Sequence, residues 1–400
     1  MTAPVMTKPG TPPAGAQQQK IVLKPFRVGV QYIDDDAYDQ TVTLNGGTQN
    51  LTPLYAIPST GFLDDVYLLA ECTVSATATA SGQGAGVENA PFCAIDTFVF
   101  TDTNGSEIIG PINGWDLAMI SKWGGYTFND DPRANADLFT APTSATASGS
   151  ANGSFNFLLR VPLELVPRDA LGAAPNKSSS TPFKIKITIA SIGAIYTSSA
   201  TQGGSLRIRM APKSYWQPTA QDGSGNAVAQ QPPGVNTTQY WAKTPYQGLS
   251  GSTSVDLDNS VGFPVRNLMF VLTTQETTPS RAHGETDWPD PVRLQVQSNI
   301  TINRIKKMWK KEITENYGYT VAGDSAGQKD NGLYIEPFNR DFGPKPGWET
   351  RRGYFRTTDG MRLQWKGTIG TSGYNGAHEL DVYTNFVGLG QGVSLASITS

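Results

Sequence analysis

The chain has 400 residues, too many for one typical hydrophobic core, so its length favours two domains of about 150–200 residues each. Just 16% of the residues are charged, and 42 glycines with 27 prolines indicate many turns, a composition typical of a β protein and not of a disordered chain. The net charge of −3 argues against a protein that binds nucleic acid with its whole surface.

The first 19 residues, "MTAPVMTKPGTPPAGAQQQ", carry a single charge and four prolines, so we expect residues 1–19 to form a flexible arm. No apolar segment follows a basic start here, as a secretory signal would require. No run of about 18 apolar residues predicts a membrane span. Cys72 and Cys93 are too few for a disulfide framework, and we interpret them as buried free thiols.

The first half of the chain is dominated by strand patterns. Strands are expected at 62–80, 92–100, 154–165 and 183–190. In the last of these, Phe183, Ile185, Ile187 and Ile189 alternate with polar residues, which predicts a strand with one buried face. The turn at Asn104-Gly105 predicts a hairpin after 92–100.

Two short helices interrupt these strands. The segment 113–125 begins with Asn113, a good N-cap residue, and Gly124 is placed to end it. The segment 166–175 has Pro167 in a first-turn position, which predicts a second short helix between two strands.

Residues 211–251 are rich in Pro, Gly, Gln, Asn and Ser, so we place a domain boundary at their start. The first domain then covers residues 20–210 and the second covers 211–400, including a C-terminal tail. Strands in the second half are expected at 267–274, 291–302, 333–338, 357–369 and 378–389. Each half thus has several strands, a strand–helix–strand unit and closing strands, which indicates an architectural duplication.

The residues that catalysis or metal binding would need are scarce. His283 and His378 are the two histidines, and we expect a surface or packing role for each, since no G-x-S-x-G or H-E-x-x-H motif is present. The acidic runs at 34–36 and 129–131 lack EF-hand spacing and are interpreted as solvated turns. The sequence therefore predicts neither an enzyme nor a cofactor or metal site, although two of the 34 acids could still meet as a glycosidase pair.

The segment "INRIKKMWKKEITENYG", residues 302–318, stands apart as a basic amphipathic helix. Its apolar residues fall within roughly 140° of arc: Ile302, Ile305, Met308, Trp309 and Ile313. Its basic residues occupy the opposite side: Arg304, Lys306, Lys307, Lys310 and Lys311. These five are the candidate contacts to an anionic surface, either lipid head groups or nucleic acid. A helix that closes a sandwich with its lysines in water, or one at a protein interface, is also compatible with this pattern.

Charge is distributed unevenly around this helix. Residues 304–366 contain 13 Lys or Arg and 8 Asp or Glu, a local charge of +5, so the remainder carries −8. The asymmetry predicts one basic face on an otherwise acidic molecule.

Several stretches together resemble a known family. They are "QKIVLKPF", "GFLDDVYLLAECTVS", "GWDLAMISK", "NGSFNFLLRVPLELVPRDALGA", the basic helix and "ELDVYTNFVGLGQGVSLASITS". In order and in short matches they are similar to the double jelly-roll major capsid proteins of tectivirus-type phages, which package DNA inside an internal membrane. The resemblance covers about residues 17–400. Its N-terminal arm departs from the helical one that family members can carry.

This resemblance implies an all-β fold of two consecutive eight-stranded jelly-roll sandwiches, with short helices in the loops. It implies a homotrimer with six jelly rolls, built into an icosahedral shell with vertex and minor capsid proteins and located in the virion after assembly in the host cytoplasm. The helices between the F and G strands would correspond to 166–174 and 302–316. Because the charge is one-sided, we expect Lys306, Lys307, Lys310 and Lys311 to face the particle interior, near an internal membrane or the genome, without specific nucleic-acid recognition. A carbohydrate-binding or carbohydrate-active sandwich, or a spike or vertex protein, is the alternative.

Overall fold

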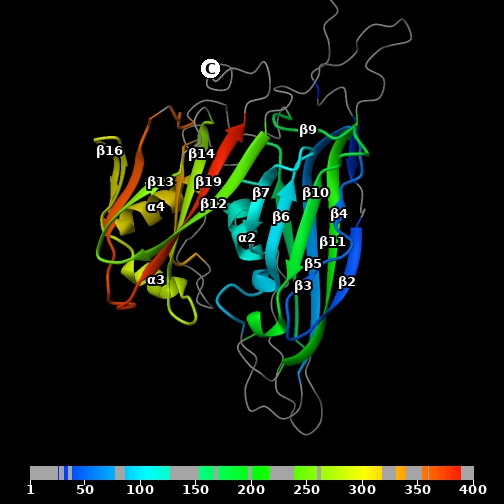
Figure 1. The fold of residues 1–400 in the computed structure, drawn as a ribbon, viewed down its shortest axis with the longest axis horizontal. Helices are drawn as coiled ribbons and strands as arrows, with labels where there is room; N and C mark the ends of the chain where they lie inside the picture. Colours follow the sequence, from blue (N-terminus) through cyan, green and yellow to red (C-terminus); the bar gives the residue numbers. More distant parts are fainter. Residues whose placement is uncertain are drawn as a thin grey trace, which may run out of the picture.

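The computed structural model describes residues 26, 31–34, 38–76, 86–126, 153–165, 170–196, 201–216, 238–258, 263–317, 330–338, 354–358 and 360–388. They form two β-sandwiches that lie side by side (Figure 1). The expected arm at 1–19, the acidic run at 129–131 and the tail after residue 388 lie outside the described residues.

The first sandwich, called roll 1 here, packs two antiparallel sheets face to face. One sheet has the order β2 (Tyr38–Leu44), β11 (Thr201–Trp216), β5 (Phe62–Ala76) and β8 (Gly153–Pro162). The other has the order β7 (Glu107–Ile112), β6 (Ile95–Thr101), β10 (Lys184–Ile189) and then β3 (Gln49–Asn50), with β4 (Tyr55–Ala56) also on β10. The short strands β1 (Gln31–Asp34) and β9 (Ala174–Pro175) pair with β11 and β5. Roll 1 also contains helix α2 (Gly114–Trp123) and the 3-10 turns η1 (Phe92–Ala94) and η3 (Ile192–Ala194).

The second sandwich, roll 2, repeats this arrangement. Its inner sheet has the order β12 (Thr238–Leu249), β19 (His378–Gly388), β14 (Val265–Thr274) and β17 (Leu333–Pro337). Its outer sheet has the order β13 (Ser252–Leu257), β18 (Leu363–Thr368), β15 (Val292–Val296) and β16 (Asn299–Arg304). Helix α3 (Arg281–Asp287) follows β14, and helix α4 (Lys306–Tyr317) joins β16 to β17.

Strand order shows that the two rolls are copies of one topology. In the inner sheet of roll 2, β12, β19, β14 and β17 take the places of β2, β11, β5 and β8 in roll 1. Each roll also carries a helix at the same step, α2 between β7 and β8 and α4 between β16 and β17. The predicted fold of two consecutive jelly rolls is therefore confirmed.

One sheet runs through both rolls. Among the described residues it contains nine strands, because β7 of roll 1 pairs in parallel with β12 of roll 2 where Ile109 meets Trp241. This pairing, at a single pair of residues, joins an edge of roll 1 to an edge of roll 2.

Local sequence signals account for several elements. The side chain of Asn113 accepts a hydrogen bond from the backbone of Asp116, whose carboxylate accepts one from Asn113 in return, and Gly124 ends the helix as predicted. On β10, Ile185, Ile187 and Ile189 are buried between exposed lysines, which confirms the predicted alternation.

The helix expected at 166–175 is wrong for its described part. Residues 170–175 form a turn and the short strand β9. Ala170 and Gly172 have φ values of 62° and 95°, a left-handed backbone that cannot continue a right-handed helix. The helix between the F and G strands of roll 1 is consequently α2 and not 166–174, whereas in roll 2 it is α4, as expected at 302–316 except that it begins at Lys306.

Two further boundaries differ from the sequence-based expectation. The last strand of roll 1 runs to Trp216, past the division expected at residue 211, because the chain around Pro212 stays paired with β5. The segment 281–287, for which the sequence analysis predicted no helix, is helix α3, which Ser280 caps through its side chain.

Candidate functional site

Helix α4 packs onto roll 2 through three aromatic and aliphatic side chains. Trp309, Ile313 and Tyr317 are buried, and the indole Nε1 of Trp309 donates a hydrogen bond to the carbonyl of Ile335 at 2.8 Å. Trp309 also contacts the rings of Trp288 and Tyr334, at 6.3 and 5.4 Å between centroids. The buried side of the helix therefore keeps Trp309 and Ile313 of the expected stripe and adds Tyr317, but it does not include Ile305 and Met308.

Glu285 on α3 holds two of the candidate lysines. Its carboxylate lies 3.5 Å from the Nζ of Lys306 and 3.1 Å from that of Lys310, and it also accepts a hydrogen bond from Tyr334. Lys310 donates further bonds to the carbonyls of Asp330 and Leu333. Burial lowers the pKa of Lys310 below its usual range, an effect that Glu285 partly offsets. Both lysines are thus engaged inside the molecule.

Arg304 is likewise engaged. It ends β16 instead of belonging to the helix, its side chain is 12% exposed, and its guanidinium pairs with Glu336 and, at 3.1 Å, with Glu312. Arg304, Lys306 and Lys310 are thus partly exposed and paired with acids from α3, α4 and β17, while contact of these residues with an anionic surface stays a prediction.

The outer side of α4 has a mixed character. Lys307 and Lys311 are exposed as predicted, but Ile305 and Met308, expected in the buried stripe, are 52% and 56% exposed. Glu315 is exposed on the same side. This outer side combines apolar surface with a net charge near +1, much less basic than the sequence suggested.

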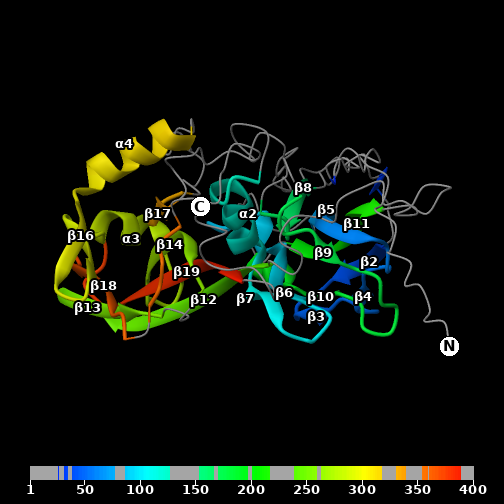
Figure 2. The same cartoon turned by 90° about the horizontal axis from the view of Figure 1, so that it is seen from above.

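Helix α2 has a different environment from α4, since all of its residues are buried. It lies between the two rolls, while α4 lies on the outside of roll 2 (Figure 2). Lys122 pairs with Asp330 at 2.8 Å, and the hydroxyl of Tyr317 donates to the carbonyl of Trp123. The guanidinium of Arg281 lies 4.3 Å from the ring centre of Trp115. Roll 2 thus buries α2 together with roll 1, where the hydroxyl of Ser121 donates to the carbonyl of Arg160 on β8.

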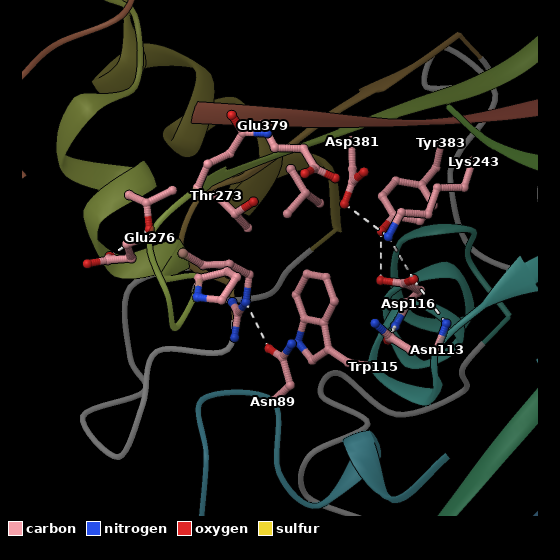
Figure 3. A pocket seen from close by; sticks show the side chains of 15 residues that line it. Asn89, Asn113, Trp115, Asp116, Lys243, Thr273, Glu276, Glu379, Asp381 and Tyr383 are labelled. Carbon is pink, nitrogen blue, oxygen red and sulfur yellow. Dashed lines mark hydrogen bonds and ion pairs between the residues drawn. The ribbon is translucent and has the colours of Figure 1, made fainter. Parts of the chain in front are cut away.

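A cavity of about 420 Å³ lies at this junction, lined by α2, β12, β14, β19 and the start of α3 (Figure 3). On one side Lys243 bridges two carboxylates, with its Nζ 3.3 Å from Asp116 and 2.9 Å from Asp381. The hydroxyl of Tyr383 donates to Asp116 at 2.7 Å. Burial raises the pKa of Asp381 to about 6 despite the nearby ammonium of Lys243. The cluster joins α2 of roll 1 to β12 and β19 of roll 2.

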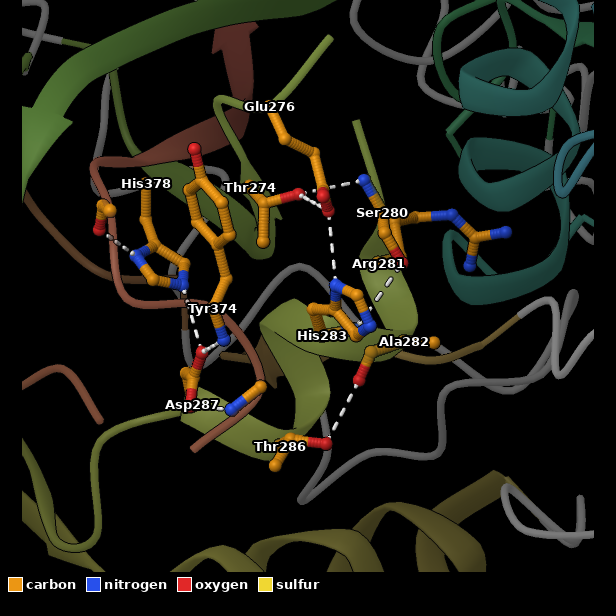
Figure 4. Close-up of polar contacts among 12 residues, drawn as sticks. Thr274, Glu276, Ser280, Arg281, Ala282, His283, Thr286, Asp287, Tyr374 and His378 are labelled. Carbon is orange, nitrogen blue, oxygen red and sulfur yellow. Dashed lines mark hydrogen bonds and ion pairs between the residues drawn. The ribbon is translucent and has the colours of Figure 1, made fainter. Parts of the chain in front are cut away.

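The two histidines occupy the kinds of position expected from the sequence (Figure 4). His283 is exposed and contacts Glu276 at 3.0 Å. His378 is buried, with Nε2 3.1 Å from Asp287 and Nδ1 3.1 Å from the carbonyl of Gly376. Asp287 also accepts the backbone N–H groups of Gly373 and Tyr374, so this contact fixes the loop before β19 to α3.

In the part of the chain that the structure describes, no group of three or more His, Cys, Asp or Glu side chains is arranged to hold a metal ion. No helix in the same residues has both the length and the apolar character needed to cross a bilayer. Cys72 and Cys93 are free thiols as predicted, although Cys93 is half-buried and not fully buried.

Comparisons with known proteins identify the fold. No protein-family model matches the chain, and no curated protein matches it in sequence. Among solved structures it is similar to the major capsid protein of Sulfolobus turreted icosahedral virus, with a TM-score of 0.58 and 14% identity over 89% of this chain and 96% of that one. It is also similar to the PBCV-1 virus capsid, with a TM-score of 0.55 and 12% identity over 94% and 100% of the two chains. The Faustovirus major capsid protein gives a TM-score of 0.51 and 10% identity over 94% and 92%.

Proposed function

We propose that this chain, which has the double jelly-roll fold of viral major capsid proteins, is the major structural subunit of an icosahedral virus shell. The observation that carries the proposal is the extent of the likeness, since a comparison covering 89% of this chain and 96% of its match includes both rolls and their order. Fold alone does not define function, so the proposal also uses the molecule's own features.

Those features suit a building block. The nine-stranded sheet makes a stiff unit of both rolls, and the polar clusters of the junction lie between elements of the two rolls. The five basic residues of 304–311 divide into three that hold the fold together and two, Lys307 and Lys311, that lie at the surface. A role in structure, without catalysis, accords with this use of charge.

The proposed subunit assembles as a homotrimer. Three chains of two rolls each make a pseudo-hexagonal unit, and symmetric copies of one chain can form a closed ring through a single repeated contact. Native mass spectrometry of the purified protein at micromolar concentration should give three times the chain mass of 42.9 kDa. A stable monomer under these conditions would count against the trimer.

Electron microscopy of particles from producing cells tests the shell itself. The expected result is icosahedral particles in which this chain is the most abundant protein, with vertex and minor proteins in lower copy number. A chain found at the vertices alone would instead be a spike or vertex protein, and specific glycan binding would favour the carbohydrate-binding alternative.

An internal membrane beneath the shell is the finer part of the proposal. It is supported by the resemblance to tectivirus-type capsid proteins, which package DNA inside an internal membrane. Purified particles should then contain phospholipid in a fixed ratio to protein. Particles free of lipid would overturn this part and leave the shell role intact.

A further inference from the structure

The junction inside each chain shows how one roll covers another. Helix α2 of roll 1 is covered by the outward side of the inner sheet of roll 2, where Val271 on β14 lines the same cavity as Trp115. Met269 shares this side of the strand by alternation, and both Met269 and Val271 are 1% exposed. An FG helix and the outward side of an inner sheet are therefore mutually buried.

Each chain has a second copy of both surfaces, and both are uncovered. The helix copy is the outer side of α4 with the residue before it, defined here as the α4 face: Ile305, Lys307, Met308, Lys311 and Glu315. The sheet copy is the outward side of β5 and β8, defined here as the β5–β8 face: Leu69, Glu71 and Leu158. Leu158 is 44% exposed and lies directly opposite Leu69, whereas their neighbours Leu68 and Leu159 point into the core.

The two uncovered faces carry groups that can pair. The α4 face presents two ammonium groups, and the β5–β8 face presents Glu71, which is 40% exposed although its carboxylate pairs with Arg209 at 2.7 Å. Within the chain an ion pair also joins the helix to the sheet, since Asp116 of α2 lies 3.3 Å from the Nζ of Lys243 on β12. Ile305 and Met308 are both more than 50% exposed, and apolar side chains of this size do not help a helix on the surface to stay soluble. Their exposure indicates a contact that excludes water and is not purely electrostatic.

We propose that the α4 face packs against the β5–β8 face of a second copy of this chain, as α2 packs against roll 2 within each copy. This contact rests on the proposed homotrimer and names the surfaces that form it. Because each chain contributes one face of each kind, the contact is head-to-tail and repeats until the ring closes. A second copy is a better partner than an anionic lipid surface, since the α4 face also presents the acidic Glu315 and two large apolar groups.

Two single variants test the contact from its two sides. Met308→Glu places a charge in the α4 face, and Leu158→Glu does so in the β5–β8 face. Both residues are exposed in the single chain, so each variant should fold, with circular dichroism and thermal unfolding like those of the wild type. Each should be monomeric at concentrations where the wild type is trimeric, because a charge buried in an apolar contact weakens association about tenfold or more. Leu54→Glu, a matched control at a residue that is also 44% exposed, should remain trimeric.

Mixing the two variants distinguishes a head-to-tail contact from any other. The Leu158→Glu chain retains an intact α4 face, and the Met308→Glu chain retains an intact β5–β8 face, so a mixture can form one native contact and no ring. Native mass spectrometry should show a heterodimer in the mixture and monomers in each separate sample.

The outcomes separate this inference from the proposed function. A wild type that is monomeric overturns the homotrimer and the contact with it. A trimeric wild type whose two variants stay trimeric overturns the contact alone. If Met308→Glu and Lys307→Glu stay trimeric but lose salt-sensitive binding to vesicles of anionic phospholipid, the α4 face contacts a membrane and the proposed contact is wrong.

Discussion

At the scale of single residues, Glu285 determines which basic side chains of the 302–318 segment reach the surface. Glu285 lies on α3, outside the segment that a helical projection of α4 covers. It binds Lys306, Lys310 and Tyr334 together. A buried ammonium group is tolerated when a carboxylate and further acceptors surround it. The basic residues of this segment therefore stabilise the fold more than they add positive charge to the surface.

Glu285→Ala should lower the free energy of unfolding by about 3 kcal/mol, since it leaves the ammonium of Lys310 buried without its carboxylate. Lys311→Met, an exposed neighbour on the same helix, should change it by less than about 0.5 kcal/mol. Urea unfolding followed by tryptophan fluorescence measures both. Equal effects of the two variants would contradict this role of Glu285, and the double variant Glu285→Ala with Lys310→Met should recover part of the loss.

Asp381 gives a prediction for pH. Its pKa in the folded protein is raised to about 6 from an ordinary value of 3.8, because burial disfavours the charged carboxylate. The folded state then holds a proton that the unfolded state has lost between these two values, so this contribution to stability is complete below the ordinary value and is lost as the pH rises through 6. The wild type should lose stability relative to Asp381→Asn between pH 5 and pH 7 in urea titrations. A difference that stays constant or grows with pH would show that the sign is wrong.

At the scale of elements, the sequence predicted what depends on neighbouring residues and missed what depends on distant ones. Helix α2 was predicted because Asn113 and Gly124 cap it locally, and β10 because its alternation is complete. Helix α3 was missed because its seven residues carry a weak pattern, and Gly284 is placed there by contact with the carbonyl of Leu272 on β14. The segment after Pro167 looked helical because proline also suits a first turn, while the left-handed backbone at Gly172 could not be foreseen.

The same reasoning explains the partial success at the candidate site. The existence of a helix near 302–318 and the burial of Trp309 and Ile313 were predictable from spacing. The rotation of the helix about its own axis was not predictable. Ile305 and Met308 fit an apolar stripe as well as the residues that are buried in the structure, and the choice depends on Glu285 and Glu336. The cluster of Asp116, Lys243 and Asp381 had no sequence signal, since it joins residues more than 100 positions apart.

The capping box of α2 gives a prediction at this scale. Asn113→Ala removes the side-chain acceptor for the backbone N–H of Asp116 and should lower the free energy of unfolding by about 1 kcal/mol. Asn113→Ser keeps an acceptor at that position and should cost a few tenths of a kcal/mol at most. Chemical unfolding of both variants checks this. An alanine variant as stable as the serine variant would mean that the cap contributes nothing beyond the tertiary contacts of α2.

At the scale of the whole molecule, the two rolls behave as one block because a sheet and a buried helix join them. The pairing of β7 with β12 continues the backbone hydrogen bonding across the junction, and α2 has no exposed residue once roll 2 is in place. Chains of two domains usually unfold in separate steps. Separate unfolding requires an interface between the domains that can open without exposing much buried surface.

Calorimetry should therefore record one cooperative transition for the wild type, with equal calorimetric and van't Hoff enthalpies. Lys122→Ala, which leaves Asp330 buried beside α2 without this ion pair, should lower the transition temperature of the whole molecule and keep it single. Two resolved transitions in the wild type would contradict the coupling.

The position of β19 has a consequence for synthesis. This strand, His378–Gly388, is made after every other strand that the structure describes, yet it lies between β12 and β14 in the middle of the sheet that faces roll 1. Before β19 has been synthesised, it cannot pair with β12 and β14 to join them, and the tryptophans of α2 are not fully buried. A product truncated before residue 378 would therefore leave the junction open and aggregation-prone. The topology thus delays formation of the junction until β19 has been translated.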